Sequence, residues 1–179
     1  MMPITYAVFK VSSLLCFRRY VYPCALVLIL CLQSQGIASA AVTAGWIEKA
    51  VIYPEGIMFH AKLDTGAKIT SINAIDPEFF ERDGQRWSRF KITNKDNKTV
   101  IIEAPVVREA TIKRHFEQKQ TRPVIMLDIC IGKVRKKEEV NLVDRSNLNY
   151  QLLIGRNFLN GDLLIDSAST YLLTPDCPR

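Results

Sequence analysis

Apolar and polar residues alternate over much of the chain beyond residue 40. From Ile57 to Leu63 every second residue is Ile, Phe, Ala or Leu, and the residues between them are Met58, His60 and Lys62. A period of two puts successive side chains on opposite faces of a β-strand. Further segments are predicted as strands because they alternate in the same way or are apolar over a strand's length: 46–53, 87–93, 99–107, 124–131, 134–143 and 163–173. Many strands at short spacing favour a small β-barrel or a β-sandwich.

Turn and helix signals separate these strands. Asn94-Lys95-Asp96-Asn97 predicts a tight turn between two of them, because Asn and Asp tolerate turn conformations. Asp76-Pro77-Glu78 predicts the start of a helix with proline near its first turn, and residues 155–159 predict a second short helix. The chain has no internal repeat, heptad pattern or low-complexity tract, so the sequence predicts one nearly all-β domain with one or two short helices.

The first forty residues have a different character. They contain three basic residues and no Asp or Glu, then an apolar stretch over residues 21–32, then Ala38-Ser39-Ala40. This order is typical of a secretory signal peptide, and the apolar stretch is shorter than the ~20 residues that span a bilayer. We therefore expect residues 1–40 to be a signal peptide cleaved after Ala40, and residues 41–179 to be a periplasmic or secreted domain. The alternative is an uncleaved segment that tethers the domain to the membrane.

Charge gives little indication of a nucleic-acid partner. The whole chain has 24 Lys and Arg against 18 Asp and Glu, a net charge of +6, but three of the basic residues precede position 41. The expected mature domain therefore carries 21 basic and 18 acidic residues, a net charge of +3. Its densest basic run, residues 133–137, is followed at once by Glu138 and Glu139, which predicts a solvated hairpin. We expect no nucleic acid among the partners.

Two of the five cysteines, Cys130 and Cys177, lie in the expected mature domain. Outside the cytoplasm these two residues could form one disulfide. The alternative is a buried thiol at Cys130 and a free thiol in the C-terminal tail, because a sequence does not show which residues are close in space.

The segment with the clearest chemistry is Asp64-Thr65-Gly66-Ala67, which comes directly after the alternating strand. The strand end fixes the direction of the Asp64 carboxylate, and the glycine lets the backbone turn sharply with its N–H near that carboxylate. The Thr65 hydroxyl can bond across to an opposing turn. Hydrolysis of a peptide by aspartates needs two carboxyl groups ~3 Å apart that share one proton, so that one activates water and the other donates to the carbonyl oxygen.

Only one Asp-Thr-Gly turn is present in the sequence. The nearest imitation, Asp166-Ser167-Ala168, has alanine in place of the glycine. The second carboxylate is most simply supplied by a second copy of the chain, with Asp64 facing its mate across a two-fold axis. The sequence therefore predicts an obligate homodimer if the chain cleaves peptides. Taken alone, Asp64 could also be an ordinary turn aspartate.

A second segment, Leu153-Ile154-Gly155-Arg156-Asn157-Phe158-Leu159, raises the weight of the first. Together the two segments resemble the retroviral-type aspartic peptidases. Over residues 45–173 the chain is similar to the bacterial retropepsin-like aspartic peptidase family, which has also been labelled as ATP-dependent zinc proteases. The resemblance is also carried by Gly45-Trp46-Ile47-Glu48, residues 61–74 and Asp144-Arg145-Ser146.

This resemblance implies a small closed acid-protease barrel with a dimeric active site. It assigns catalysis to Asp64, Thr65 and Gly66, with Thr65 in the hydrogen-bond network across the dimer. Ala67 and Lys68 are the expected substrate contacts. The expected supports of the site, behind the catalytic turn, are Ile154, Gly155 and Arg156.

The chain departs from the retroviral pattern at two places. In the retroviral enzymes an acidic residue follows the D-T-G-A tetrad and pairs with the arginine of the Gly-Arg segment. Here Lys68 takes that place, so Arg156 needs another partner, for which Asp144 or Asp166 could serve. Retroviral flaps are rich in glycine, whereas residues 85–131 contain none, so any flap over the substrate must be hinged differently.

Neither a metal nor a cofactor is predicted. The sequence has no G-x-x-x-x-G-K-[ST] phosphate loop and no H-E-x-x-H zinc motif. Its histidines are His60, predicted as a strand-face residue, and His115, predicted in a solvated polar stretch. A zinc site would need three or four ligands in a suitable geometry.

The sequence thus predicts an exported aspartic endopeptidase that acts on peptides or proteins as a homodimer. The basic residues Lys68, Lys113, Arg114 and Arg122 could favour acidic peptides or could be plain surface charge. The main alternative is a non-catalytic module on the same fold that binds an extended peptide by strand addition. A metallopeptidase is the third hypothesis.

Overall fold

The computed structural model describes residues 40–113 and 119–178. The expected signal peptide up to residue 39, together with Arg114 and His115, lies outside the described residues. The described part of the chain contains strands β1 to β11 and one short helix, α2 (Arg156–Leu159). The prediction of a nearly all-β domain is confirmed.

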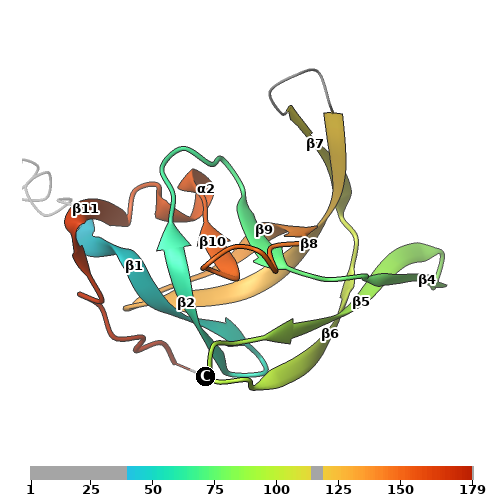
Figure 1. Ribbon diagram of the computed structural model, residues 1–179, viewed down its shortest axis with the longest axis horizontal. Helices are drawn as coiled ribbons and strands as arrows, with labels where there is room; N and C mark the ends of the chain where they lie inside the picture. Colours follow the sequence, from blue (N-terminus) through green and yellow to red (C-terminus); the bar gives the residue numbers. More distant parts are fainter. Residues whose placement is uncertain (1–39, 114–118, 179) are drawn as a thin grey trace, which may run out of the picture. The chain divides into compact units, whose positions relative to one another are not determined.

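Six strands close into a mixed barrel (Figure 1). The pairs β2–β10 and β3–β9 are parallel, and the other pairs around the ring are antiparallel. The ring closes where β1 meets β8, with Val51 opposite Cys130 and Ile52 opposite Ile129. In order around the barrel the strands are β1 (Val42–Tyr53), β2 (Ile57–Leu63), β10 (Leu152–Ile154), β3 (Thr70–Asn73), β9 (Val134–Val143) and β8 (Lys119–Ile131).

The other strands extend this barrel. Strand β7 (Arg108–Lys113) forms an antiparallel hairpin with the first half of β8. Strand β11 (Leu163–Thr170) pairs in parallel with the beginning of β1 and is an edge strand. A separate antiparallel sheet contains β4 (Glu78–Arg82), β5 (Gln85–Thr93) and β6 (Thr99–Pro105).

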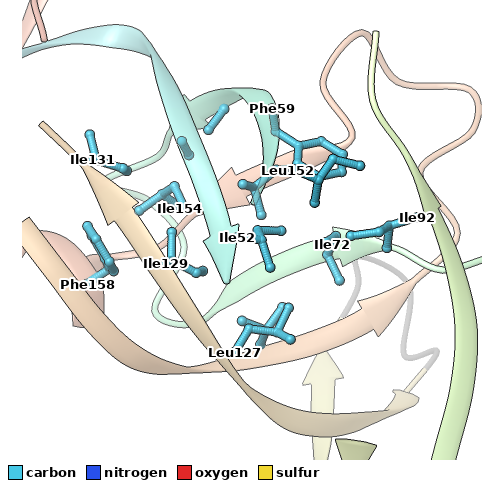
Figure 2. Close-up of a cluster of buried hydrophobic side chains, with 14 of the residues drawn as sticks. Ile52, Phe59, Ile72, Ile92, Leu127, Ile129, Ile131, Leu152, Ile154 and Phe158 are labelled. Carbon is cyan, nitrogen blue, oxygen red and sulfur yellow. The ribbon is translucent and has the colours of Figure 1, made fainter. Parts of the chain in front are cut away.

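The inward positions predicted from the alternation are buried. In β2 the four apolar positions are at most 4% exposed, and the residues between them are half-buried. Figure 2 shows Phe59 of β2 in one apolar cluster with Ile52, Ile129, Leu152 and Phe158. Burial of each such side chain contributes about 1.5–3 kcal/mol relative to exposure, so the core fixes the strands from which the loops of the site emerge.

The prediction of a helix that starts at Asp76-Pro77-Glu78 is wrong. Strand β4 begins at Glu78, and Asp76 has a φ of 45°, which is incompatible with a helix. Phe80 of β4 lies opposite Trp87 of β5, with the two rings stacked. Pairing with a neighbouring strand thus overrides the local helix-start signal. The helix predicted over residues 155–159 is confirmed as α2.

The segment after β11 is fixed to the barrel by two features. The Cys130–Cys177 disulfide joins it to the end of β8, which is one of the two alternatives for these cysteines. The completely buried Glu48 carboxylate accepts hydrogen bonds from the backbone N–H groups of Gly45, Leu172 and Leu173. No helix within residues 40–113 and 119–178 is both long and apolar enough to cross a bilayer.

Candidate active site

Asp64 stands at the end of β2 in a tight turn. Its backbone N–H donates to the carbonyl of Ile154 at 2.9 Å, which ties the turn to β10. Its Oδ1 accepts a hydrogen bond from the Gly66 N–H at 2.9 Å. A Cβ on residue 66 would lie 3.1 Å from Oδ1, so glycine leaves room for the carboxylate to sit against the backbone. The half-buried carboxylate therefore has a fixed direction while it remains accessible.

The Gly-Arg segment joins β10 to α2 (Figure 1), with Gly155 just before the helix and Arg156 as its first residue. A Cβ on Gly155 would lie 2.6 Å from the Ile69 carbonyl carbon, so only glycine permits this approach. The Gly155 N–H donates to Thr70 Oγ1 at 3.1 Å. The Arg156 N–H donates to the Ala67 carbonyl at 2.8 Å. The structure therefore places Ile154, Gly155 and Arg156 directly behind the Asp-Thr-Gly turn.

Arg156 has a different partner from either one expected. Its Nη1 donates to the carbonyl oxygens of Thr65, at 2.7 Å, and of Gly66, at 3.0 Å. Asp144 instead accepts hydrogen bonds from Ser146. Asp166 accepts hydrogen bonds from residues 168 and 169. The expectation of Asp144 or Asp166 as partner was wrong, because the guanidinium fork reaches backbone carbonyls of the turn and needs no carboxylate there.

A groove of about 500 Å³ runs between this turn and the β7–β8 hairpin. Gly66, Ala67 and Lys68 line one side of it. Arg108 lines the hairpin side and is paired with Glu139 through two hydrogen bonds of 2.9 and 2.6 Å. That pairing lowers the pKa of the Glu139 carboxyl and raises the pKa of Arg108. The β7–β8 hairpin therefore lies across the groove from the Asp-Thr-Gly turn, and its described strands contain no glycine.

Arg145 is the residue of this site that sequence reasoning missed. It was part of the family resemblance, but no pattern in the sequence gave it a role. It is 9% exposed and lines the groove with the Asp-Thr-Gly turn. Its Nε donates to the Tyr150 carbonyl at 3.0 Å and its Nη1 to Ser71 Oγ at 3.2 Å. Burial lowers the pKa of Arg145, and the nearby negative charge of Asp64 opposes that shift.

A second hollow, of about 650 Å³, lies on the other side of the turn. Thr65, Lys68 and Arg156 line it together with residues of β11. Leu164 of β11 is 60% exposed and Val42 of β1 is 47% exposed. Within the described residues the Thr65 hydroxyl makes no hydrogen bond. The face that carries the turn is therefore apolar at the edge strand and polar at Thr65.

The expected substrate contacts and histidines are placed as follows. Lys68 is exposed and lines both hollows, and Ala67 lines the groove. Arg122 also lines the groove and donates to Gln120 and Asn141. His60 is half-buried on β2 and hydrogen-bonded to the Tyr171 hydroxyl at 2.7 Å. The Lys113 side chain lies outside the described part of the structure. Over residues 40–113 and 119–178 no three His, Cys, Asp or Glu side chains form a group able to hold a metal ion.

A six-stranded mixed barrel that holds an Asp-Thr-Gly turn against a Gly-Arg segment defines the class of retropepsin-like folds. The comparison with known families agrees, because residues 43–176 match the RimB-like family, described as retropepsin-like aspartic endopeptidase RimB. The chain belongs to the RimB-like family.

Similar proteins include solved and curated examples. A crystal structure of a Legionella pneumophila protein of unknown function (DUF785) matches with a TM-score of 0.63 and 30% identity, over 75% of this chain and 98% of that one. A protein of Desulfotalea psychrophila named probable alpha-L-glutamate ligase is 32% identical over 76% of this chain. One of the same name from Shewanella pealeana is 30% identical over 63% of it. The chain spans 30% and 25% of the lengths of these two ligase-named relatives.

Proposed function

We propose that this protein is an aspartic endopeptidase in which two Asp64 carboxyl groups, one from each protomer of a homodimer, activate a water molecule. The observation that carries the proposal is the geometry of the turn. The Gly66 N–H holds the Asp64 carboxylate, and the Arg156 guanidinium and the backbone of β10 brace the loop from behind. This arrangement keeps the carboxylate preorganised, which is what electrostatic catalysis requires.

The chemistry needs the second copy. In the pair, one carboxylate is ionised and takes a proton from water while the other is protonated and donates toward the substrate carbonyl oxygen. Two like charges at hydrogen-bond distance cannot both be ionised, so the pair holds one shared proton. One Asp64 without a mate lacks the acid of this pair.

Three features of the turn's exposed face support the homodimer. The Thr65 hydroxyl is available for a hydrogen bond across a two-fold axis. Strand β11 is an unpaired edge, which can be extended by a strand from a second copy. The exposed Leu164 and Val42 side chains provide apolar area for that contact.

The names of the relatives and the charge of the groove together support a glutamate-containing peptide as the substrate. The curated relatives are named as ligases of alpha-L-glutamate, and this chain matches only part of their length. A peptidase domain in the same polypeptide as such a ligase would act on glutamyl peptides. Among the described residues, Lys68 and Arg145 line the groove without an ion pair to a carboxylate, whereas Arg108, also in its lining, is paired with Glu139. We further propose export through the N-terminal segment, which N-terminal sequencing of the purified envelope protein tests: a chain that begins at Ala41 is the expected result.

The test of the function is an Asp64→Asn variant compared with the wild type. We expect the wild type to cleave peptides from a glutamate-rich library, and the variant to keep its melting temperature and dimerisation while cleavage falls at least a thousandfold. Sedimentation is measured on the same samples. Equal cleavage by a clean variant preparation would refute the assignment. A strictly monomeric wild type that binds peptides without cleaving them would favour the non-catalytic module.

A further inference from the structure

Lys62 and Arg145 define a basic hollow beside the Asp64 turn. It has a volume of about 460 Å³ and is separate from the groove under the hairpin, with which it shares Arg145 and Leu153. Lys62 lies on β2, two positions before Asp64, which begins the turn after that strand. Trp46 and Tyr150 also line the hollow, with their rings edge to face at 6.1 Å, and the other lining residues are Leu148, Asn149 and Leu153. No acidic residue lines the hollow.

The charges in this hollow have no carboxylate partner of their own. Five arginines form ion pairs with Asp or Glu residues that the structure also describes: Arg82, Arg86, Arg89, Arg108 and Arg135. Within the described residues, neither Lys62 nor Arg145 forms an ion pair with a carboxylate. Arg145 is nevertheless almost completely buried, and its hydrogen bonds to Tyr150 and Ser71 use Nε and Nη1.

A buried guanidinium without a counter-charge is costly for the free protein, because desolvation is not offset by a partner. Its contacts to a carbonyl and a hydroxyl hold the guanidinium plane in place, so Nη2 remains for a ligand. Asp64 offsets part of this charge from a distance. In the proposed reaction, however, the two Asp64 groups share one negative charge between two such hollows. A carboxylate entering the hollow would therefore gain two cationic partners, with Arg145 already oriented.

We propose that this hollow is the subsite for an acidic side chain next to the scissile bond, and that Lys62 and Arg145 are the residues that determine this specificity. Trp46, Tyr150 and Leu153 would cover the aliphatic stem of a glutamate while the two cations bind its carboxylate. The proposal rests on the proposed function, because it identifies which residue of the substrate the same site selects.

The test compares a peptide cleaved in an Asp64-dependent manner with its counterpart in which the glutamate beside the cut is glutamine. This pair changes charge with little change in shape. We expect wild-type kcat/KM to favour glutamate by about ten- to a hundredfold, the worth of a hydrogen bond to a charged group. In Lys62→Met and Arg145→Gln the ratio of kcat/KM for the glutamate peptide to that for the glutamine peptide should fall below threefold. Lys91→Met, an exposed lysine on β5, is the matched control and should keep the wild-type preference.

A binding measurement separates this inference from the proposed function. The Asp64→Asn protein is titrated with a labelled peptide of alternating alanine and glutamate and with its glutamine counterpart. The wild type could cleave no peptide while Lys62→Met, made in the Asp64→Asn protein, abolishes the preference for binding the glutamate peptide. That outcome would support the subsite and refute the peptidase assignment. Asp64-dependent cleavage without glutamate preference, or with a preference that persists in both subsite variants, would overturn the subsite alone. Lys62→Met decides the matter if Arg145→Gln does not fold, because within the described residues the Lys62 side chain has no ion-pair partner to lose.

Discussion

Gly155 is the position at which an added methyl group should destabilise the fold most. An alanine there would put its Cβ 2.6 Å from the carbonyl carbon of Ile69 and 2.9 Å from its nitrogen and oxygen, whereas ordinary contact begins at 3.4 Å. All three atoms belong to the backbone, so no rotamer change relieves the overlap. The two segments must separate by roughly 0.8 Å, and overpacking of this kind costs about 3 kcal/mol.

The displacement would also reach the active site. Ile69 follows the Asp-Thr-Gly turn, and Asn157 donates to the carbonyl of Lys68, so a shift of either segment moves the loop that carries Asp64. We expect Gly155→Ala to lower the melting temperature by about 10 °C, at roughly 4 °C per kcal/mol for a domain of this size. Peptide cleavage should fall more than tenfold at a temperature where the variant is still folded, because misplacement of a catalytic group by a fraction of an ångström is expensive.

The matched control is Gly56→Ala in the β1–β2 turn. Gly56 has a φ of +63°, and a methyl group added there would have no atom within 4 Å, so the substitution carries the backbone cost alone. That cost is about 1–2 kcal/mol for the left-handed conformation, and cleavage should not change. Thermal unfolding and cleavage kinetics are measured on both variants. A Gly155→Ala protein as stable as Gly56→Ala, with wild-type cleavage, would refute the reasoning from close approach.

Four further changes test individual contacts. Cys177→Ser removes the disulfide across 47 residues and should cost about 4 kcal/mol in the chain-entropy description, so that reductant lowers the melting temperature of the wild type but not of the variant. Glu48→Gln leaves one acceptor oxygen for three backbone N–H groups and should cost about 2 kcal/mol, read from denaturant unfolding. Arg156→Met should keep the melting temperature within a few degrees and reduce cleavage, because it removes the brace on the turn; unchanged cleavage would argue against that brace. The pKa of Glu139 is lowered in the folded state, so its ion pair with Arg108 stabilises the fold at pH values above the unfolded-state pKa. That stabilisation is lost as the pH falls through the folded-state pKa, and the free energy of unfolding of Arg108→Gln should therefore decrease less steeply with falling pH than that of the wild type.

Alternation predicted β2 well, because that strand is buried on one face only, and the first half of β9 alternates as well. The segment 57–63 is β2 with the predicted inward residues, and the segment 134–143 is β9 without a change of boundary. Strands β3 and β10 were missed because each contains no more than four residues. They exist because neighbours on both sides supply their hydrogen bonds, which is information about the barrel rather than about the segment.

The site divides in the same way. The turn of Asp64 and Gly66 could be predicted from sequence because its requirement is local, a carboxylate at a strand end followed by a residue without a Cβ. The place of Gly155 came only from the family resemblance, because its requirement is the close approach of Ile69. The partner of Arg156 could not, because its guanidinium bonds main-chain oxygens, and any residue type supplies those. Arg145 was also beyond prediction, since its burial depends on β3 and on the loop before β10.

Lys68 stands where the retroviral enzymes have an acidic residue, and Arg156 accordingly has different hydrogen-bond partners from the arginine of those enzymes. With no carboxylate at position 68, the guanidinium donates to the carbonyls of Thr65 and Gly66, and these contacts brace the Asp-Thr-Gly turn from within the same chain. The second copy in the proposed dimer then has less to organise. It must bring a mate for Asp64 and for the Thr65 hydroxyl, while the direction of each carboxylate is already set by its own barrel. For the proposed glutamyl substrate, Lys68 and Arg145 in the lining of the groove supply the complementary charge.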